Sequence, residues 1–204
     1  MTELVTEVAN YHCQTGENPL FRESHQRIYW EDIDSGRLFR AQHETLEHEC
    51  FYQGPVMGGF SFQADGTLLL FEQDRIASLD PESGKRRVLR EGIDGDMARF
   101  NDVIADPEGR VFAGTIGKTE ESGGLYRVER DGSVLCFDPD AKLELRVELP
   151  VPKVSSVTFG GPELDTLYIT TAGGHPGATS ADGSLYRLKT AARGKLPFLS
   201  RVAL

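Results

Sequence analysis

The stretch NDVIADPEGRVFAGT, residues 101–115, contains two β-prone runs on either side of a Pro-Glu-Gly turn. The apolar and β-branched residues of NDVIA and RVFAGT favour strands, and the Pro-Glu-Gly sequence favours a tight reversal between them. A further β-prone run, GGLYRV at 123–128, follows. The stretch therefore predicts consecutive antiparallel strands of one small sheet.

The same order of segments recurs along the chain. The middle strand is predicted four times, at RIYWEDI (27–33), TLLLFE (67–72), RVFAGT (110–115) and TLYITT (166–171). A strand precedes each copy: NPLF (18–21), GGFSF (58–62), NDVIA (101–105) and SSVTF (155–159). A strand also follows each copy: GRLFRA (36–41), RIASLD (75–80), GGLYRV (123–128) and GSLYRL (183–188). QADG, DPEG and GPELD mark the turn before three of the middle strands, and RESHQ takes that place in the first.

The spacing of these repeats predicts a β-propeller. Equivalent positions Ile28, Leu68, Val111 and Leu167 are separated by 40, 43 and 56 residues. Units of about 40–45 residues with several antiparallel strands are typical of propeller blades, because one small sheet cannot bury both of its faces alone. A β-sandwich is the alternative, but it would show turn signals without self-similar blocks. The long third interval contains SVLCFDPDAKLELRVELPVPKV (133–154), which we interpret as a hairpin without an inner strand.

Composition limits the classes of function. The net charge of −10 makes nucleic acid an unexpected partner, because phosphate binding needs clustered Lys and Arg. No apolar run reaches the length of a membrane span, and the N-terminal MTELVTEVANYHC has no secretory signal. Cys13, Cys50 and Cys136 form no CxxC pair, so we expect three free thiols and a cytoplasmic location.

Several motifs together resemble the senescence marker protein / regucalcin / gluconolactonase family. The resemblance covers nearly the whole chain, and RFND followed by DPEGRVFAGT is specific to it, as is VSSVTFGGPELDTLYITTA. The other matching segments are GENPLF, RIYWEDIDSGRLFR, GGLYRVERDGSV and GSLYRL. Members are six-bladed propellers that bind one divalent metal in a central channel, and many hydrolyse sugar lactones. The resemblance therefore implies metal-dependent hydrolysis of a sugar lactone as the function of this chain.

The resemblance also implies roles for particular residues. Glu17, in GENP, looks like a metal ligand, and Arg99 and Asn101 look like residues that hold the lactone oxygens. Asp102 matches the same motif with a local role. Glu121 lies in GTIGKTEESGG (114–124), which matches a loop over the site, and we expect it to contact substrate.

The chain departs from the family pattern near residues 133–137. In relatives, a segment with an Asn ligand, a whole blade, and a segment with an Asp that is both ligand and general base come here; neither segment occurs in this sequence. We therefore expect a single propeller domain over 1–204 with an internal deletion of about one and a half blades, leaving four to five. Two of three metal ligands are then missing, the catalytic base is unknown, and the site for one divalent ion (Ca, Mg, Mn, Zn or Fe) is weakened or lost.

Other interpretations remain open at this point. A catalytically impaired, regucalcin-like metal-binding or scaffold propeller is the alternative function, and exposed blade edges would allow homo-oligomers. Taken alone, Glu17 is a solvated loop carboxylate, Arg99 a salt-bridge partner across blades, and the Asn101–Asp102 pair an Asx-turn. His43 and His48 are conceivable metal ligands, but a solvated strand edge is the simpler interpretation.

Overall fold

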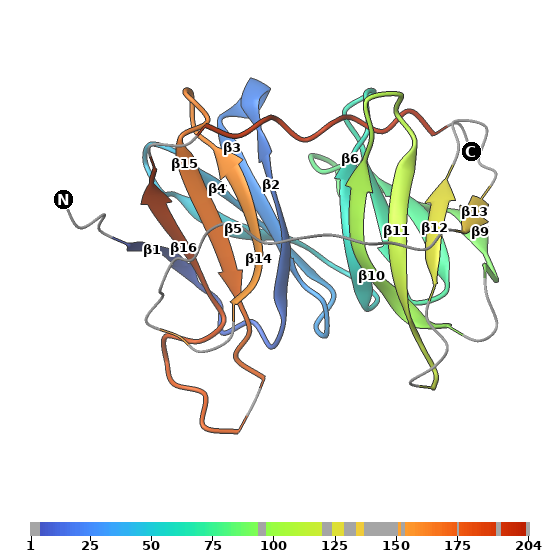
Figure 1. The fold of residues 1–204 in the computed structure, drawn as a ribbon, viewed down its shortest axis with the longest axis horizontal. Helices are drawn as coiled ribbons and strands as arrows, with labels where there is room; N and C mark the ends of the chain where they lie inside the picture. The colour runs from blue at the N-terminus through green and yellow to red at the C-terminus, as the bar shows by residue number, and fades with distance from the viewer. Residues whose placement is uncertain are drawn as a thin grey trace. The chain divides into compact units, whose positions relative to one another are not determined.

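The described residues of the chain fold into four antiparallel, four-stranded sheets (Figure 1). The computed structural model describes residues 5–93, 97–119, 124–128, 134–136, 151, 154–174, 176–190 and 193–202. Within these residues the only helix is a single 3-10 turn, η1 (Glu23–His25), so no described helix has the length or apolar character that crossing a bilayer requires. The all-β prediction and the four predicted repeats are confirmed.

The first compact unit, residues 1–54 and 149–197, contains two sheets, which we call blades 1 and 4. Blade 1 consists, from its innermost strand outward, of β2 (Gly16–Arg22), β3 (Arg27–Asp32), β4 (Arg37–Gln42) and β5 (His48–Gln53). Blade 4 consists of β14 (Val154–Gly160), β15 (Thr166–Thr171), β16 (Ser184–Lys189) and β1 (Thr6–Asn10).

The second unit, residues 55–148 and 198–204, contains blades 2 and 3. Blade 2 consists of β6 (Met57–Phe62), β7 (Leu68–Glu72), β8 (Arg75–Leu79) and β9 (Arg86–Glu91). Blade 3 consists of β10 (Met97–Ala105), β11 (Val111–Gly117), β12 (Leu125–Val128) and β13 (Val134–Cys136). β13 corrects the interpretation of 133–154 at its start, because these residues complete blade 3; residues 137–150, which would form the rest of the predicted hairpin, lie outside the described residues.

Two pairings that the sequence did not reveal involve the ends of the described chain. β1 pairs antiparallel with β16, so an N-terminal strand completes the blade formed by the last three strands. Near the other end, the backbone of Ser200 pairs in parallel with Gln63, and Val202 joins the core of the second unit. Segments distant in sequence therefore complete both units.

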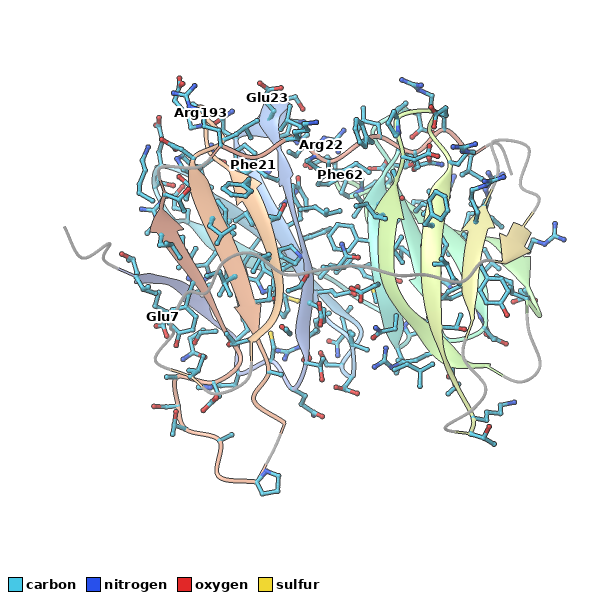
Figure 2. The ribbon with its side chains drawn as sticks, viewed as in Figure 1. Glu7, Phe21, Arg22, Glu23, Phe62 and Arg193 are labelled. Atoms are coloured by element: carbon cyan, nitrogen blue, oxygen red, sulfur yellow. The ribbon has the colours of Figure 1, made fainter. Side chains whose placement is uncertain are left out.

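Each unit has its own apolar core between its two blades. In the first unit Phe21, Trp30, Phe39 and Tyr168 are buried together, and the ring of Phe21 on β2 stacks on Tyr168 of β15 with 6.3 Å between centroids. Figure 2 labels Phe21 among the strands of this unit. In the second, Phe100 of β10 meets Phe71 of β7 edge to face at 5.2 Å. Not every blade aromatic belongs to these cores, because Phe112 and Phe159 are only half-buried.

His43 is part of this core rather than of a solvated edge. It lies on the turn between β4 and β5, half-buried, and its ring meets Phe21 and Tyr168 edge to face. Its Nδ1 lies 2.5 Å from the hydroxyl oxygen of Tyr168. Burial, and then the nearby Arg187, lower the pKa of His43 from its ordinary value of 6.5. The interpretation of a solvated edge holds for the exposed His48 and is wrong for His43.

We expect the first unit to lose stability as the pH falls below 6.5. The unfolded chain takes up a proton at the ordinary pKa, whereas folded His43 takes one up only at lower pH, so acid favours unfolding. Lys189 acts in the same direction as Arg187, and Glu44 and Asp165 oppose it. When the pH is lowered from 7.5 to 5.5, the denaturant concentration at the unfolding midpoint should fall less steeply in His43→Gln than in the wild type. If the midpoint of His43→Gln depended on pH as steeply as that of the wild type, this expectation would be contradicted. His12→Asn changes an exposed histidine of the same unit and serves as the control, with the pH dependence of the wild type.

Two of the three cysteines are free thiols, as expected: Cys13 is buried and Cys50 exposed. Burial raises the pKa of the Cys13 thiol to about 12, so this group stays protonated. The side chain of Cys136 lies outside the described ones.

Candidate functional site

Each of the four innermost strands has a shift in its pairing register, at a β-bulge or a similar irregularity, which we call a bulge. The pairing register shifts between Glu17 and Leu20 in β2, between Met57 and Phe60 in β6, between Asn101 and Val103 in β10, and between Val154 and Ser156 in β14. A bulge leaves a residue outside the ladder and redirects its side chain, which is why bulges are common beside functional sites. GENP and RFND, the two segments predicted to carry the site, therefore lie at equivalent irregularities of blades 1 and 3.

Asn and Asp permit two of these bulges because they tolerate left-handed backbone. Asn18 has φ of 50° and Asp102 has φ of 59°, a region that most side chains avoid. Glu17 and Asn101 each come directly before such a residue. The two predicted binding residues thus occupy the same place in their respective blades.

In the first unit, Glu17 is half-buried beside two polar groups. The backbone N–H of Asn18 donates to Oε2 of Glu17 at 3.2 Å, and Asn18 itself is 7% exposed. From the facing bulge of β14, the hydroxyl of Ser155 donates to the carbonyl of Gly16 and lies 3.0 Å from Oγ1 of Thr170. Glu17 is therefore held in a polar, partly enclosed setting, which differs from a freely solvated loop carboxylate.

In the second unit, Arg99, Asn101 and Asp102 form one connected group. Nη1 of Arg99 donates to the carbonyl of Phe100 and to Oδ1 of Asn101, both at 2.9 Å, and Nδ2 of Asn101 lies 3.4 Å from Oδ2 of Asp102. Arg99 forms no ion pair with a described carboxylate, so the salt-bridge interpretation is not supported within the described chain. Since Nη1 makes both bonds, the N–H groups on Nη2 and Nε remain as donors for a ligand oxygen.

The backbone of this group is fixed by close contact with blade 2. A Cβ atom placed on Gly58 of β6 would lie 1.6 Å from the carbonyl oxygen of Phe100 and 2.9 Å from the backbone nitrogen of Asn101. Only glycine permits this approach. Phe100, buried between the two blades, fixes the strand from the other side. Arg99 and Asn101 therefore project from a rigid piece of β10.

The predicted site residues divide between the units. Arg99 and Asn101 lie together in the second unit, Glu17 lies in the first, and Glu121 lies outside the described residues. Sequence reasoning missed Asn18, Ser155 and Gly58, although each is at a bulge of an innermost strand. In the described part of the chain, no three His, Cys, Asp or Glu side chains are grouped to hold a metal ion.

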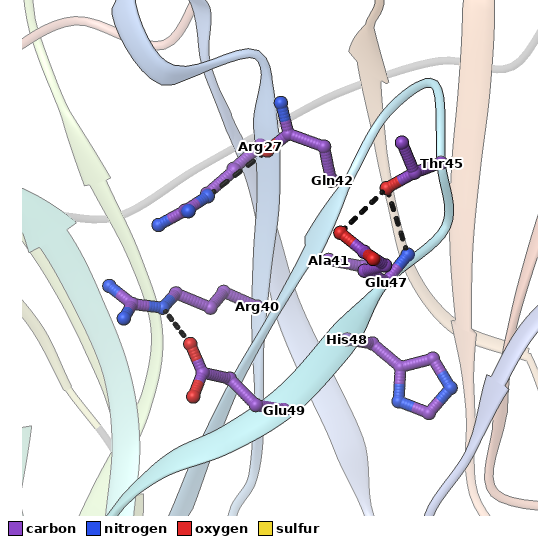
Figure 3. A pocket seen from close by; sticks show the side chains of 8 residues that line it. All are labelled: Arg27, Arg40, Ala41, Gln42, Thr45, Glu47, His48 and Glu49. Carbon is purple, nitrogen blue, oxygen red and sulfur yellow. Dashed lines mark hydrogen bonds and ion pairs between the residues drawn. The ribbon is translucent and has the colours of Figure 1, made fainter.

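A separate cavity of about 480 Å³ opens on the outer strands of blade 1 (Figure 3). The two arginines of its lining already have polar partners there. Arg40 forms an ion pair with Glu49 at 2.7 Å, and Nε of Arg27 donates to the side-chain oxygen of Gln42 at 3.1 Å. His48, at its margin, has its Nδ1 2.8 Å from the hydroxyl of Tyr11. This cavity presents no net charge that would select a ligand.

Comparison with known proteins agrees with the resemblance in sequence. The model of the family described as SMP-30/Gluconolactonase/LRE-like region matches residues 15–135 and 128–173. Pentonolactonase XacC of Haloferax volcanii is 30% identical over 291 residues, covering 98% of this chain and 99% of that protein. A 6-deoxy-6-sulfogluconolactonase of Pseudomonas putida is 29% identical over 69% of this chain, and this chain spans 53% of that relative's length.

The fold is shared with solved structures of the same kind. Regucalcin, a calcium-binding protein from Agrobacterium tumefaciens, matches with a TM-score of 0.84 at 16% identity, covering 98% of each chain. At this identity the match establishes the fold only. The predicted β-propeller is confirmed, and four blades are present among the described residues.

Proposed function

Because the chain belongs to the SMP-30/Gluconolactonase/LRE-like family, we propose that it hydrolyses a sugar lactone to the open-chain sugar acid. The observation that carries this proposal is the Arg99–Asn101 pair, fixed at the bulge of β10 with guanidinium donors available to a ligand. The names of the two curated relatives, a pentonolactonase and a sulfogluconolactonase, support an aldonolactone as substrate.

Lactone hydrolysis requires that the site stabilise an oxyanion. Water adds to the lactone carbonyl carbon, the carbonyl oxygen becomes negatively charged, and the bond to the ring oxygen then breaks as that oxygen takes a proton. We assign the guanidinium of Arg99 to the carbonyl oxygen, because charge-assisted hydrogen bonds strengthen as negative charge develops there. Asn101, held by Arg99 at 2.9 Å, is assigned to a sugar hydroxyl.

Asp102 is our candidate for the base that removes a proton from the attacking water. It is exposed, it contacts Asn101, and the family's own general-base Asp is absent from this sequence. A carboxylate within hydrogen-bond reach of the water suffices for this role. Asp102→Asn should lower kcat and leave the backbone intact, since Asn also tolerates the left-handed conformation.

The residues present do not complete a divalent-ion site. Such an ion would polarise the carbonyl and lower the pKa of a bound water, but Ca²⁺ takes six or more oxygen ligands and Mg²⁺ an octahedron. Glu17 is the one family-matched ligand retained, and no grouping of three candidate ligands exists in the described residues. We therefore propose a weak ion site at Glu17 and derive no catalytic step from it.

Calcium titration tests this expectation. We expect a dissociation constant of roughly 1 mM or weaker, because one carboxylate with backbone and amide oxygens supplies few charged ligands. The heat of binding should vanish in Glu17→Gln and persist in Glu23→Gln, which alters an exposed carboxylate on η1. Micromolar binding, or loss of binding in both variants, would contradict the assignment.

We also propose that the chain lacks blades that its longer relatives have. The match to the Haloferax protein extends over 291 positions against the 204 residues of this chain, so at least 87 positions have no counterpart here. The two segments of the family match overlap at 128–135, close to the break predicted at 133–137. A scaffold or metal-binding role without catalysis is the second candidate function. The absence of a three-ligand group among the described residues favours its scaffold form over its metal-binding form.

Hydrolysis measured directly separates the two candidates. Acid release from fresh pentono- and hexono-lactones is followed in a pH-stat, with the spontaneous rate subtracted. We expect a rate proportional to protein concentration for at least one lactone. A rate equal to that of buffer for every lactone, with and without added Ca²⁺, Mg²⁺, Mn²⁺ or Zn²⁺, would leave the scaffold role.

A further inference from the structure

A second cavity, of about 400 Å³, lies in the first unit and has a lining unlike the rest of this acidic chain. Its lining residues are Thr6, His43, Thr166, Arg187, Leu188 and Lys189. The chain has a net charge of −10, yet the lining contributes two cations, one of which is paired with the carboxylate of Asp165. We call it the β16 cavity, because three of its lining residues belong to that strand.

The two cations are held in place by their neighbours. Nη1 of Arg187 donates to the carbonyl of His43 at 3.0 Å, and the guanidinium also forms a hydrogen bond with the hydroxyl of Tyr168. A guanidinium has five N–H donors, so others remain for a ligand. Nζ of Lys189 lies 2.8 and 2.6 Å from the two carboxylate oxygens of Asp165, and this bond lowers the pKa of Asp165. An ammonium has three donors, so one remains after both contacts with Asp165.

Neutral donors complete the lining. The hydroxyl of Tyr168 lies 2.5 Å from Nδ1 of His43. In the tautomer in which the hydroxyl donates to Nδ1, the neutral imidazole carries its hydrogen on Nε2, as a donor. The hydroxyls of Thr6 and Thr166 add two more, and Thr166 is 4% exposed. Guanidinium, ammonium, imidazole N–H and hydroxyl groups are the partners that a phosphate oxygen accepts from.

The β16 cavity is separate from Glu17. Thr166 begins β15, whereas Thr171 ends it, and the carbonyl of Thr171 is the backbone group that approaches Gly16, next to Glu17. The cavity and Glu17 therefore lie at opposite ends of the strands of this unit. We propose that the β16 cavity binds a phosphate group, either free or carried by a small sugar, for which the volume leaves room.

Isothermal titration of the whole chain with inorganic phosphate and with glucose 6-phosphate tests this inference, at constant ionic strength set with chloride. We expect saturable heat with at least one of them and none with glucose. Lys189→Gln should weaken binding at least fivefold, because it removes one of two cations. Lys195→Gln, an exposed cation of the same unit outside the cavity, should leave the affinity unchanged.

The two arms identify the source of the phosphate group. Tighter binding of glucose 6-phosphate than of phosphate assigns a phosphorylated sugar, and equal affinities assign the free anion. Absence of saturable heat with both compounds would overturn the inference, as would equal weakening in Lys189→Gln and Lys195→Gln. Circular dichroism of both variants confirms that each is folded before binding is compared.

Discussion

Replacing Arg99 with Ala is expected to lower kcat/KM for lactone hydrolysis at least 100-fold. Removing one pre-positioned donor to a developing oxyanion costs about 100- to 1,000-fold in rate, and Nη1 of Arg99 also holds Asn101 at 2.9 Å. Most of the loss should appear in kcat, because the negative charge is largest in the transition state. Initial rates of acid release over a range of lactone concentrations measure the two parameters separately.

Arg99→Lys and Arg90→Gln make this result interpretable. Lys keeps the charge but loses the planar fork, so we expect an intermediate rate. Arg90 is an exposed arginine of β9 in the same unit, and its replacement should leave kcat/KM within twofold of the wild type. Equal losses in Arg99→Ala and Arg90→Gln would mean that net charge, not position, matters.

Gly58→Ala is expected to lower the free energy of unfolding of the second unit by about 3 kcal/mol, at the upper end for overpacking. The added Cβ would collide with three backbone atoms of Phe100 and Asn101, the nearest at 1.6 Å. A flexible side chain could change rotamer to avoid such a collision, but here the backbone of β10 itself would have to move. Because the strand that must move carries Arg99 and Asn101, activity should fall as well. Denaturant unfolding followed by circular dichroism measures the loss of stability.

Gly84→Ala is the matched control in the same unit. Gly84 has φ of 69° and open space where its Cβ would lie, so its substitution tests backbone strain without a collision. We expect a cost of about 1 kcal/mol. If Gly58→Ala were no more destabilising than Gly84→Ala, the close approach of β6 to β10 would not be a feature of the protein in solution.

Three strands of every blade could be predicted because local signals and repetition agree there. The strands before and after TLLLFE and RVFAGT are rich in apolar residues, and the turns that precede TLLLFE and RVFAGT contain Gly or Pro. Those turns form as expected: the N–H of Gly66 donates to Gln63 and that of Gly109 to Asp106. Where a residue pattern and a turn coincide, sequence suffices to place the strand.

The outer strands could not be predicted in the same way. β5 and β9 are largely exposed and carry residues such as His48, Glu49 and Arg87, so no apolar alternation marks them. β1 becomes a strand through its pairing with β16, across most of the chain length. Long-range pairing of this kind leaves little trace in a single local segment.

The site was predicted from motifs rather than from physics. The resemblance selected Glu17, Arg99 and Asn101, and the structure adds the reason for their positions, which is a bulge with left-handed Asn18 or Asp102 beside it. The role of Glu121, a single domain over 1–204 and a cytoplasmic location stay predictions. Homo-oligomerisation through exposed blade edges also stays a prediction. Ile104 of β10, an apolar side chain that is 64% exposed, is a surface residue that such contacts could cover.

A crystal structure of the chain with a sugar lactam tests the central claim most directly. The lactam keeps the ring and the carbonyl of an aldonolactone, but its amide bond resists hydrolysis, so it reports where the substrate is held. We expect its carbonyl oxygen within hydrogen-bond distance, about 2.7–3.2 Å, of the Arg99 guanidinium, and one of its hydroxyls within hydrogen-bond distance of Asn101. A lactam bound away from β10, or none bound at saturating concentration, would contradict it.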